Sequence, residues 1–124
     1  MAPPNDKPDG ERVLVSWRAV VIPPNAQPGR GARGRVREIE PGGVLFESGN
    51  LMGRGTKVRL AIMLPPPRRE AQAHIVEVAC TVAWSVIARD KVATRLTFHQ
   101  FMQGGRDALE AVVGMSLESS EPGL

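Results

Sequence analysis

Residues 34 to 46 read GRVREIEPGGVLF, and this stretch predicts the β-hairpin around which the rest of the chain is arranged. Val36 and Ile39 belong to a short charged strand, residues 41 to 43 supply the turn, and the apolar run 44 to 46 opens the next strand. Glycine adopts positive φ without a steric penalty, so we expect the Pro-Gly-Gly corner to reverse the chain tightly. The stretch therefore indicates a fold built from β-strands.

Four further segments alternate between apolar and other side chains with the period of two that is typical of strands. They span residues 13–22, 56–64, 74–87 and 92–101. We expect both faces of the first segment to be covered, because neither face is fully polar. In the longest segment the even-numbered positions are expected to face the core, Trp84 and Val86 among them. Together with the hairpin, the pattern predicts six strands.

The period changes near residue 105, where a short C-terminal helix is expected. The positions at helical spacing are Leu109, Val112, Val113 and Ser116. Gly114 lies inside this pattern and is expected to weaken the helix. Six strands followed by one helix predict an all-β fold, namely a small antiparallel six-stranded β-barrel with a C-terminal α-helix as a plug or cover.

The length of 124 residues suits one domain, which can bury roughly two-thirds of the surface of the unfolded chain. The hydrophobic content of 42% is that of a globular protein and argues against global disorder. We expect a flexible Pro-rich arm over residues 1–11, the barrel domain with its helix over residues 12–117, and a frayed tail over residues 118–124.

The formal net charge of +3 favours anionic partners, but it does not choose among a nucleotide, a nucleic acid and a membrane surface. The single cysteine, Cys80, excludes an intramolecular disulfide and lies in an apolar strand pattern, so we expect it to be buried. The first residues lack the apolar segment of a signal peptide, and no run approaches the roughly 20 apolar residues that cross a bilayer. We expect a soluble, cytoplasmic protein without a membrane span.

The hairpin resembles the second motif of PilZ domains, G-x-V-x-D-x-S-x-x-G, which is met here by Gly34, Val36 and Gly43. The two polar positions differ, because Glu38 stands in the place of Asp and Glu40 in the place of Ser. The resemblance implies a small barrel with a helix. It also implies cyclic di-GMP as the ligand, held by this hairpin together with an R-x-x-x-R pair just ahead of the first strand.

The resemblance covers roughly residues 12–115, and the arginine pair that it implies is incomplete. Arg12 stands at the second position of the pair, and Pro8 occupies the first. Another R-x-x-x-R occurs at Arg33 and Arg37, where strand alternation places both side chains on one face and offers a displaced clamp. Arginine suits this role because its planar fork pairs with phosphate oxygens and with the O6/N7 edge of guanine.

The candidate ligand site combines these arginines with the hairpin positions that the resemblance places beside the ligand. Its residues are Arg12, Arg30, Arg33, Arg35, Arg37, Glu38, Glu40 and Gly43. A carboxylate about 6 Å from a phosphate opposes binding by about 3 kcal/mol, or roughly a hundredfold in affinity. The arginines from residue 30 to 37 either offset this repulsion or pair with the two glutamates across a solvated hairpin.

The sequence predicts neither a catalytic nor a metal site. His74 and His99 are far apart and lie at strand positions, and no metal-ligand spacing or nucleophile elbow is present. Glycines 29, 31 and 34 spell G-x-G-x-x-G, but the pattern leads into a strand instead of a helix, so no dinucleotide site is expected. The stretch GRGARGR resembles a nucleic-acid-binding segment, although few aromatic residues are left for stacking.

We therefore expect a non-catalytic PilZ-like regulatory module in bacterial cyclic di-GMP signalling, with a role in type IV pilus or motility control. The acidic residues at positions 38 and 40 favour an adaptor that acts by contact with a protein partner and needs no cofactor. One alternative is a genuine cyclic di-GMP receptor that uses Arg12 and the arginines from 30 to 37. Another, with the weakest support, is a basic barrel that binds nucleic acid.

Overall fold

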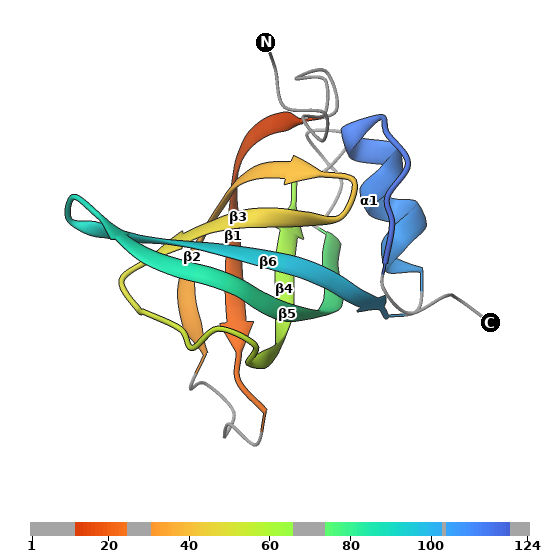
Figure 1. Ribbon diagram of the computed structural model, residues 1–124. Helices are drawn as coiled ribbons and strands as arrows, with labels where there is room; N and C mark the ends of the chain where they lie inside the picture. The colour runs from red at the N-terminus through yellow and green to blue at the C-terminus, as the bar shows by residue number, and fades with distance from the viewer. Residues whose placement is uncertain (1–11, 25–30, 66–73, 103, 120–124) are drawn as a thin grey trace, which may run out of the picture.

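The computed structural model of the protein describes residues 12–24, 31–65, 74–102 and 104–119. Within these ranges the chain forms six strands followed by one helix (Figure 1). The elements are β1 (Val13–Ile22), β2 (Ala32–Glu40), β3 (Gly43–Ser48), β4 (Lys57–Leu64), β5 (His74–Ala88), β6 (Lys91–Phe101) and α1 (Gly105–Val113). The expected arm over residues 1–11 and most of the expected tail, residues 120–124, lie outside the described residues.

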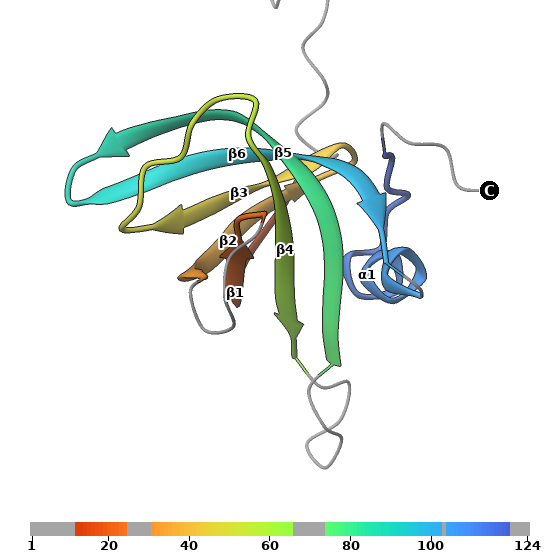
Figure 2. The ribbon, with the colours of Figure 1, turned by 90° about the horizontal axis from the view of Figure 1, so that it is seen from below.

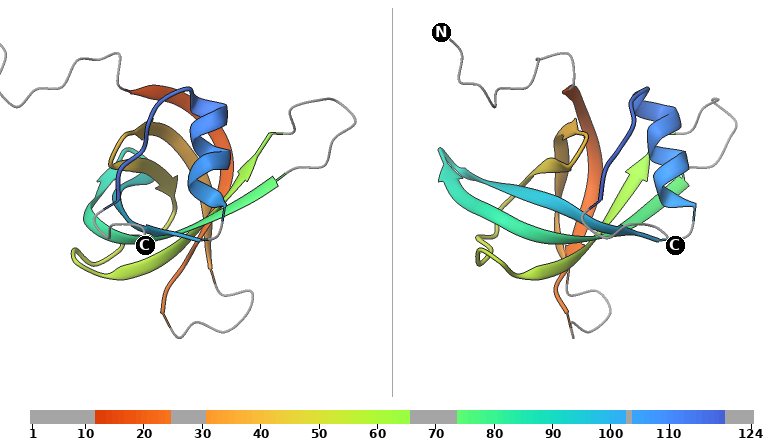
Figure 3. Two further views of the ribbon diagram at one scale, coloured as in Figure 1. Left: turned by 90° about the vertical axis from the view of Figure 1, so that its right-hand side faces the viewer. Right: turned by 45° about the vertical axis from the view of Figure 1, so that its right-hand side comes forward.

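The six strands close into a barrel in the order β1-β2-β3-β6-β5-β4, and each neighbouring pair is antiparallel. The long hairpin of β5 and β6 extends away from the barrel on one side (Figures 1 and 2). Helix α1 lies at the opposite end, where it faces the viewer in the left panel of Figure 3. The predicted fold class, a small antiparallel six-stranded barrel with a C-terminal helix, is confirmed.

Side chains from all six strands fill the barrel. The largest fully buried side chains of the strands include Phe46, Phe98, Ile39, Leu60, Ile62 and Leu96. Leu109 of α1 and Leu117, which follows the helix, are fully buried in the same cluster. Burial of a leucine side chain contributes roughly 1.5–3 kcal/mol. The helix and the segment after it are therefore part of the core and not an external appendage.

A β-bulge in β5 changes which side chains reach this core. The register against β6 shifts between Val82 and Trp84, so that Val82 pairs with Leu96 inside the barrel and Trp84 pairs with Arg95 on the outer face. Trp84 is 41% exposed and Val86 is 49% exposed. The expectation that these two residues face the core is wrong, because one extra residue in a strand reverses the alternation of every position beyond it.

Strand β1 is covered on one face only. Ala19 and Val21 are buried against the core, and Trp17 packs on it in part. On the other face Leu14 is 76% exposed and Arg18 is exposed. The expectation that both faces are covered is wrong, because a closed barrel has one interior and the described residues form no second layer outside this strand.

Helix α1 ends at Val113, earlier than the spacing that includes Ser116 predicts. Gly114 follows with φ 72° and donates its backbone N–H to the Glu110 carbonyl oxygen at 2.8 Å. This is the left-handed conformation that glycine adopts at helix ends. Gly114 therefore terminates the helix and is not a weak point within it, which corrects the sequence-based interpretation.

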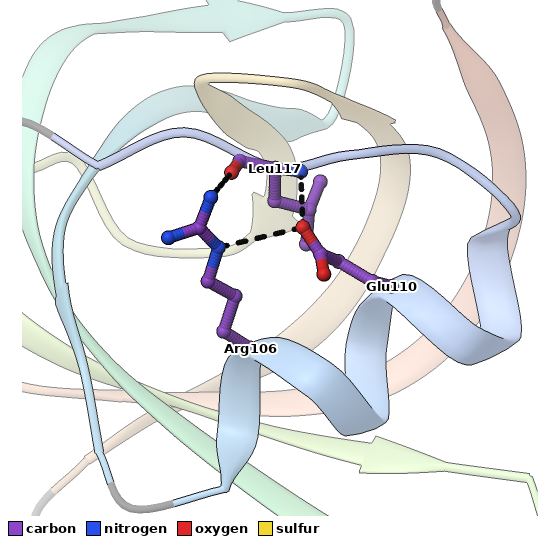
Figure 4. Close-up of polar contacts among 3 residues, drawn as sticks. All are labelled: Arg106, Glu110 and Leu117. Atoms are coloured by element: carbon purple, nitrogen blue, oxygen red, sulfur yellow. Dashed lines mark hydrogen bonds and ion pairs between the residues drawn. The ribbon is translucent and has the colours of Figure 1, made fainter. Parts of the chain in front are cut away.

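The segment after α1 turns back along the helix and is held by polar contacts (Figure 4). Arg106 Nη2 donates to the Leu117 carbonyl oxygen at 2.6 Å, and the Leu117 N–H donates to Glu110 Oε2 at 2.7 Å. The Glu118 N–H then donates to the carbonyl oxygen of Pro41 at 2.6 Å. The chain end thus links the helix to the turn of the central hairpin.

The turn between β2 and β3 consists of Pro41 and Gly42. Positive φ is absent at both Gly42 and Gly43, so the expected reason for the glycines is wrong. A Cβ atom at Gly43 would lie 2.1 Å from the carbonyl oxygen of Leu96 on β6. Gly43 is therefore required by the close approach of two strand backbones, whereas a Cβ at Gly42 would meet nothing within 4 Å.

We expect Gly43→Ala to lower the free energy of unfolding by about 1–3 kcal/mol or more, because the new methyl group must push β3 away from β6. Gly42→Ala is the matched control and should change stability by less than about 0.5 kcal/mol. Urea denaturation followed by circular dichroism measures both values. Equal effects of the two substitutions would contradict the close approach at Gly43.

Candidate functional site

The outer face of the central hairpin carries the two glutamates that depart from the PilZ motif. Arg12 Nη1, just ahead of β1, donates to Glu38 Oε1 at 3.0 Å. Arg95 Nη1 of β6 lies 3.2 Å from Glu40 Oε1. The cations that pair with these glutamates therefore come from the residue ahead of β1 and from β6, and not from the arginines of β2. Arg30, which belonged to the predicted site, lies outside the described residues.

Arg95 occupies an enclosed position of this surface. Its side chain is 19% exposed, and its guanidinium carbon lies 6.0 Å from the centre of the Trp84 ring. Nη1 is buried and close to Glu40, but it has no partner in hydrogen-bond alignment among the described residues. The contact is thus an ion pair, supported by a cation–π contact on the other side. Loss of either charge would leave the other partly buried without compensation.

A second group of cations lies farther along β1 and β2, on the same outer face. Arg18 pairs with Arg35 in the register of the two strands, and Val20 pairs with Arg33. Arg35 Nη1 donates to the carbonyl oxygen of Ser16 at 3.3 Å. Among the described residues, the only hydrogen-bond acceptors for these arginines are the carbonyl and hydroxyl oxygens of Ser16. In the part of the chain that the structure describes, no carboxylate forms an ion pair with an arginine of this group.

Arg37 completes this group because it occupies a β-bulge. The register of β2 against β3 shifts between Val36 and Glu38, and Arg37 is the extra residue. Its Nη1 donates to Ser16 Oγ at 3.3 Å, so the side chain lies on the outer face beside Arg35. The structure therefore brings together Arg33 and Arg37, the pair that the sequence offered as a displaced clamp, on one surface.

The four arginines line an open hollow of about 790 Å³ on the outside of the barrel, which we call the arginine hollow. Its charged lining residues are Arg18, Arg33, Arg35, Arg37, Lys91 and Glu47. Its other wall is apolar and includes Ala61, Met63 and Ile75 from β4 and β5. Arg12, Glu38, Glu40 and Gly43 are not part of its lining. The predicted site residues thus divide between the arginine hollow and the paired charges of the hairpin.

Several residues of this surface were not predicted to be site residues from the sequence. Arg18, Lys91, Arg95 and Trp84 come from β1, β5 and β6, at positions far from the motif in the sequence. Barrel closure places β6 beside β3, and a bulge turns Trp84 outward. The one signal in the sequence was the position of Arg18, which alternation places on the strand face opposite Trp17 and Ala19.

Two further groups bear on chemistry, namely the thiol of Cys80 and the side chains that could hold a metal ion. Cys80 is buried, and its burial raises the pKa of the thiol to about 12, so the nucleophilic thiolate is suppressed at neutral pH. Among the described residues, no group of three His, Cys, Asp or Glu side chains is placed to hold a metal ion. Within the same part of the chain, no helix is long and apolar enough to cross a membrane.

Comparison with known proteins finds a protein with a similar fold. No protein-family model and no curated protein matches the chain. The solved structure of the Bacillus subtilis inhibitor of motility MotI/DgrA superposes with a TM-score of 0.67 at 20% sequence identity. The match covers 91% of this chain and 55% of that chain, so the present chain spans about half of its neighbour. The barrel order and the terminal helix, together with this match, define a PilZ-like fold.

Proposed function

We propose that the chain is a non-catalytic PilZ-like regulatory module that acts through contact with a protein partner and does not bind cyclic di-GMP at its hairpin. The observation that carries this proposal is the pairing of Glu38 with Arg12 and of Glu40 with Arg95. The resemblance places ligand-contacting groups at these two acidic positions. Here the two cations beside these positions, Arg12 and Arg95, are already engaged in ion pairs within the chain.

The electrostatics of the hairpin support this proposal. A phosphate that took Arg12 away from Glu38 would leave the carboxylate unpaired beside a second negative charge. At a separation of about 6 Å this repulsion amounts to about 3 kcal/mol, or roughly a hundredfold in affinity. Arg95 offers no replacement, because its side chain is mostly buried between Glu40 and Trp84.

The setting of the proposed activity is bacterial motility control within cyclic di-GMP signalling, with type IV pilus control as a further setting that the sequence resemblance implies. The structural neighbour MotI/DgrA is an inhibitor of motility, and this supports the regulatory character of the proposal.

Isothermal titration of the full chain with cyclic di-GMP, at low and at physiological salt, tests this proposal. We expect no saturable binding at micromolar concentration at either salt. A triple variant, Pro8→Arg with Glu38→Asp and Glu40→Ser, restores the family's pattern and should bind at least about tenfold more tightly than the parent. The control is Asp90→Asn with Asp107→Asn, which changes the net charge by the same amount at exposed positions outside β2 and β3. A parent chain that binds at micromolar concentration or tighter would overturn the proposal.

The arginine hollow favours a second candidate function, that of a genuine cyclic di-GMP receptor with a displaced site. Among the described residues, its arginines form no ion pair with a carboxylate, although Glu47 lies in the same lining, so they are available to a phosphate. In this case the parent would bind cyclic di-GMP, and Arg33→Ala with Arg35→Ala would abolish binding while Arg12→Ala would not. The same titration therefore separates the two candidates.

A further inference from the structure

The arginine hollow brings together positively charged side chains that repel one another. Arg18 and Arg35 lie directly opposite each other on paired strands, an arrangement that destabilises a sheet. Arg33 and Arg37 lie beside them, and Lys91 adds a fifth cation at the rim. Glu47 is the one carboxylate among the described lining residues, and it forms no ion pair with them. Such a surface is best compensated by an anionic occupant from outside the chain.

The opposite wall of the hollow selects the kind of anion. Met63 and Ile75 pair across β4 and β5 and are 42% and 57% exposed, respectively. Ala61 and Val20 pair across β4 and β1 beside them and continue the apolar wall. An occupant that fills the hollow must therefore present carboxylates or phosphates on one side and apolar side chains on the other.

Nucleotides and single-stranded nucleic acid match this lining poorly. Bases bind to proteins largely by stacking on aromatic rings, and no aromatic residue is among the described residues that line the hollow. Trp17 packs partly against the core, and Trp84 lies against Arg95. The apolar wall consists of aliphatic side chains and Met63, which suit leucine-like groups better than base edges.

We infer that the arginine hollow docks an acidic amphipathic segment of the protein partner, with its carboxylates on the arginines and its apolar face on Met63 and Ile75. This inference rests on the proposed function, because it names the chemistry of the partner in that contact. Arginine forks bind carboxylates in bidentate geometry, which fixes the orientation of the segment. A helix with acidic and apolar faces would meet both walls at once, in the manner of helix-in-groove recognition.

The test uses the full chain and a fluorescent synthetic peptide of about 18 residues that places Glu and Leu on opposite faces of a helix. A scrambled peptide of the same composition is the first control, and an oligothymidylate of similar charge is the second. Fluorescence anisotropy at about 0.05 M and about 0.3 M salt gives the affinity and its salt dependence. We expect the amphipathic peptide to bind at least about tenfold more tightly than either control probe.

Variants of the two walls sharpen the test. Arg33→Glu with Arg35→Glu should weaken peptide binding by about tenfold or more and flatten its salt dependence. Arg54→Glu with Lys57→Glu produces the same change in net charge at exposed positions outside the hollow and should stay within about threefold of the parent. Met63→Ser with Ile75→Ser should weaken binding several-fold without a change in salt dependence. Thermal unfolding confirms that each variant is folded.

Three results would overturn the inference. The scrambled peptide could bind as well as the amphipathic one, the control reversal could weaken binding as much as the reversal in the hollow, or the oligothymidylate could bind most tightly. None of these results touches the proposed function, which would then use another surface. Conversely, tight cyclic di-GMP binding that depends on Arg12 would defeat the proposed function at the hairpin, whatever the peptide does.

Discussion

Val78→Asp is expected to unfold the domain. Val78 is fully buried in β5, where it pairs with Leu60 of β4 and with Phe101 of β6. An aspartate there would place an unpaired charge among apolar side chains, a change that costs about 4–5 kcal/mol or more. Domains of this size have a free energy of unfolding of about 5–15 kcal/mol, so little or no cooperative transition should remain.

Val86→Asp is the matched control on the same strand. Val86 has the same parity as Val78 in the sequence but lies beyond the bulge and is 49% exposed. Its substitution should cost about 1 kcal/mol or less, which corresponds to the low strand propensity of aspartate. Thermal unfolding by circular dichroism compares the two variants. A cooperative transition of the Val78→Asp protein near the unfolding temperature of the parent would contradict the burial of Val78 in a closed barrel.

The second large effect is expected for Leu117→Ala, a change close to the end of the chain. Leu117 is fully buried in the barrel core, and its backbone is held by Arg106 and Glu110 (Figure 4). Truncation of a buried leucine to alanine removes apolar burial and leaves a cavity, which together cost about 2–5 kcal/mol. We therefore expect a clear loss of stability from a segment that carries no regular secondary structure.

Val112→Ala provides the comparison for Leu117→Ala, because both remove branched apolar carbons near the C-terminal helix. Val112 is 45% exposed, and alanine has the higher helix propensity, so the free energy of unfolding should change by less than about 0.5 kcal/mol. Urea denaturation of the two variants gives both values. A Leu117→Ala protein as stable as the Val112→Ala protein would show that the segment after α1 does not complete the core.

Much of the fold could be predicted from alternation, because each strand of a closed barrel has one inner and one outer face. Residues 13–22 and the strand that ends at Leu64 follow this rule along their whole length. The rule failed at Trp84, because a bulge depends on the match between two strands and not on either strand alone. The burial of Leu117 could not be predicted for another reason, since a residue outside helices and strands leaves no periodic pattern in the sequence.

The candidate site could be predicted only in part. The arginines of β2 were visible in the sequence because they cluster within a few residues. The sequence did not show that Glu38 and Glu40 pair with other cations, because this depends on Arg12, ahead of β1, and Arg95 of β6 reaching the hairpin. The apolar wall of the arginine hollow comes mainly from β4 and β5, and only barrel closure places β4, with β5 on its far side, beside β1.

The most direct measurement of the central claim is a map of backbone amide chemical shifts during titration of the full chain with cyclic di-GMP. The claim is that the paired charges at Glu38 and Glu40 close the hairpin to this ligand. We predict that the amides of residues 38–40, 42 and 43 keep their chemical shifts up to millimolar ligand. Saturable shifts of these amides at micromolar ligand, accompanied by a shift of the Arg12 side chain, would contradict the account.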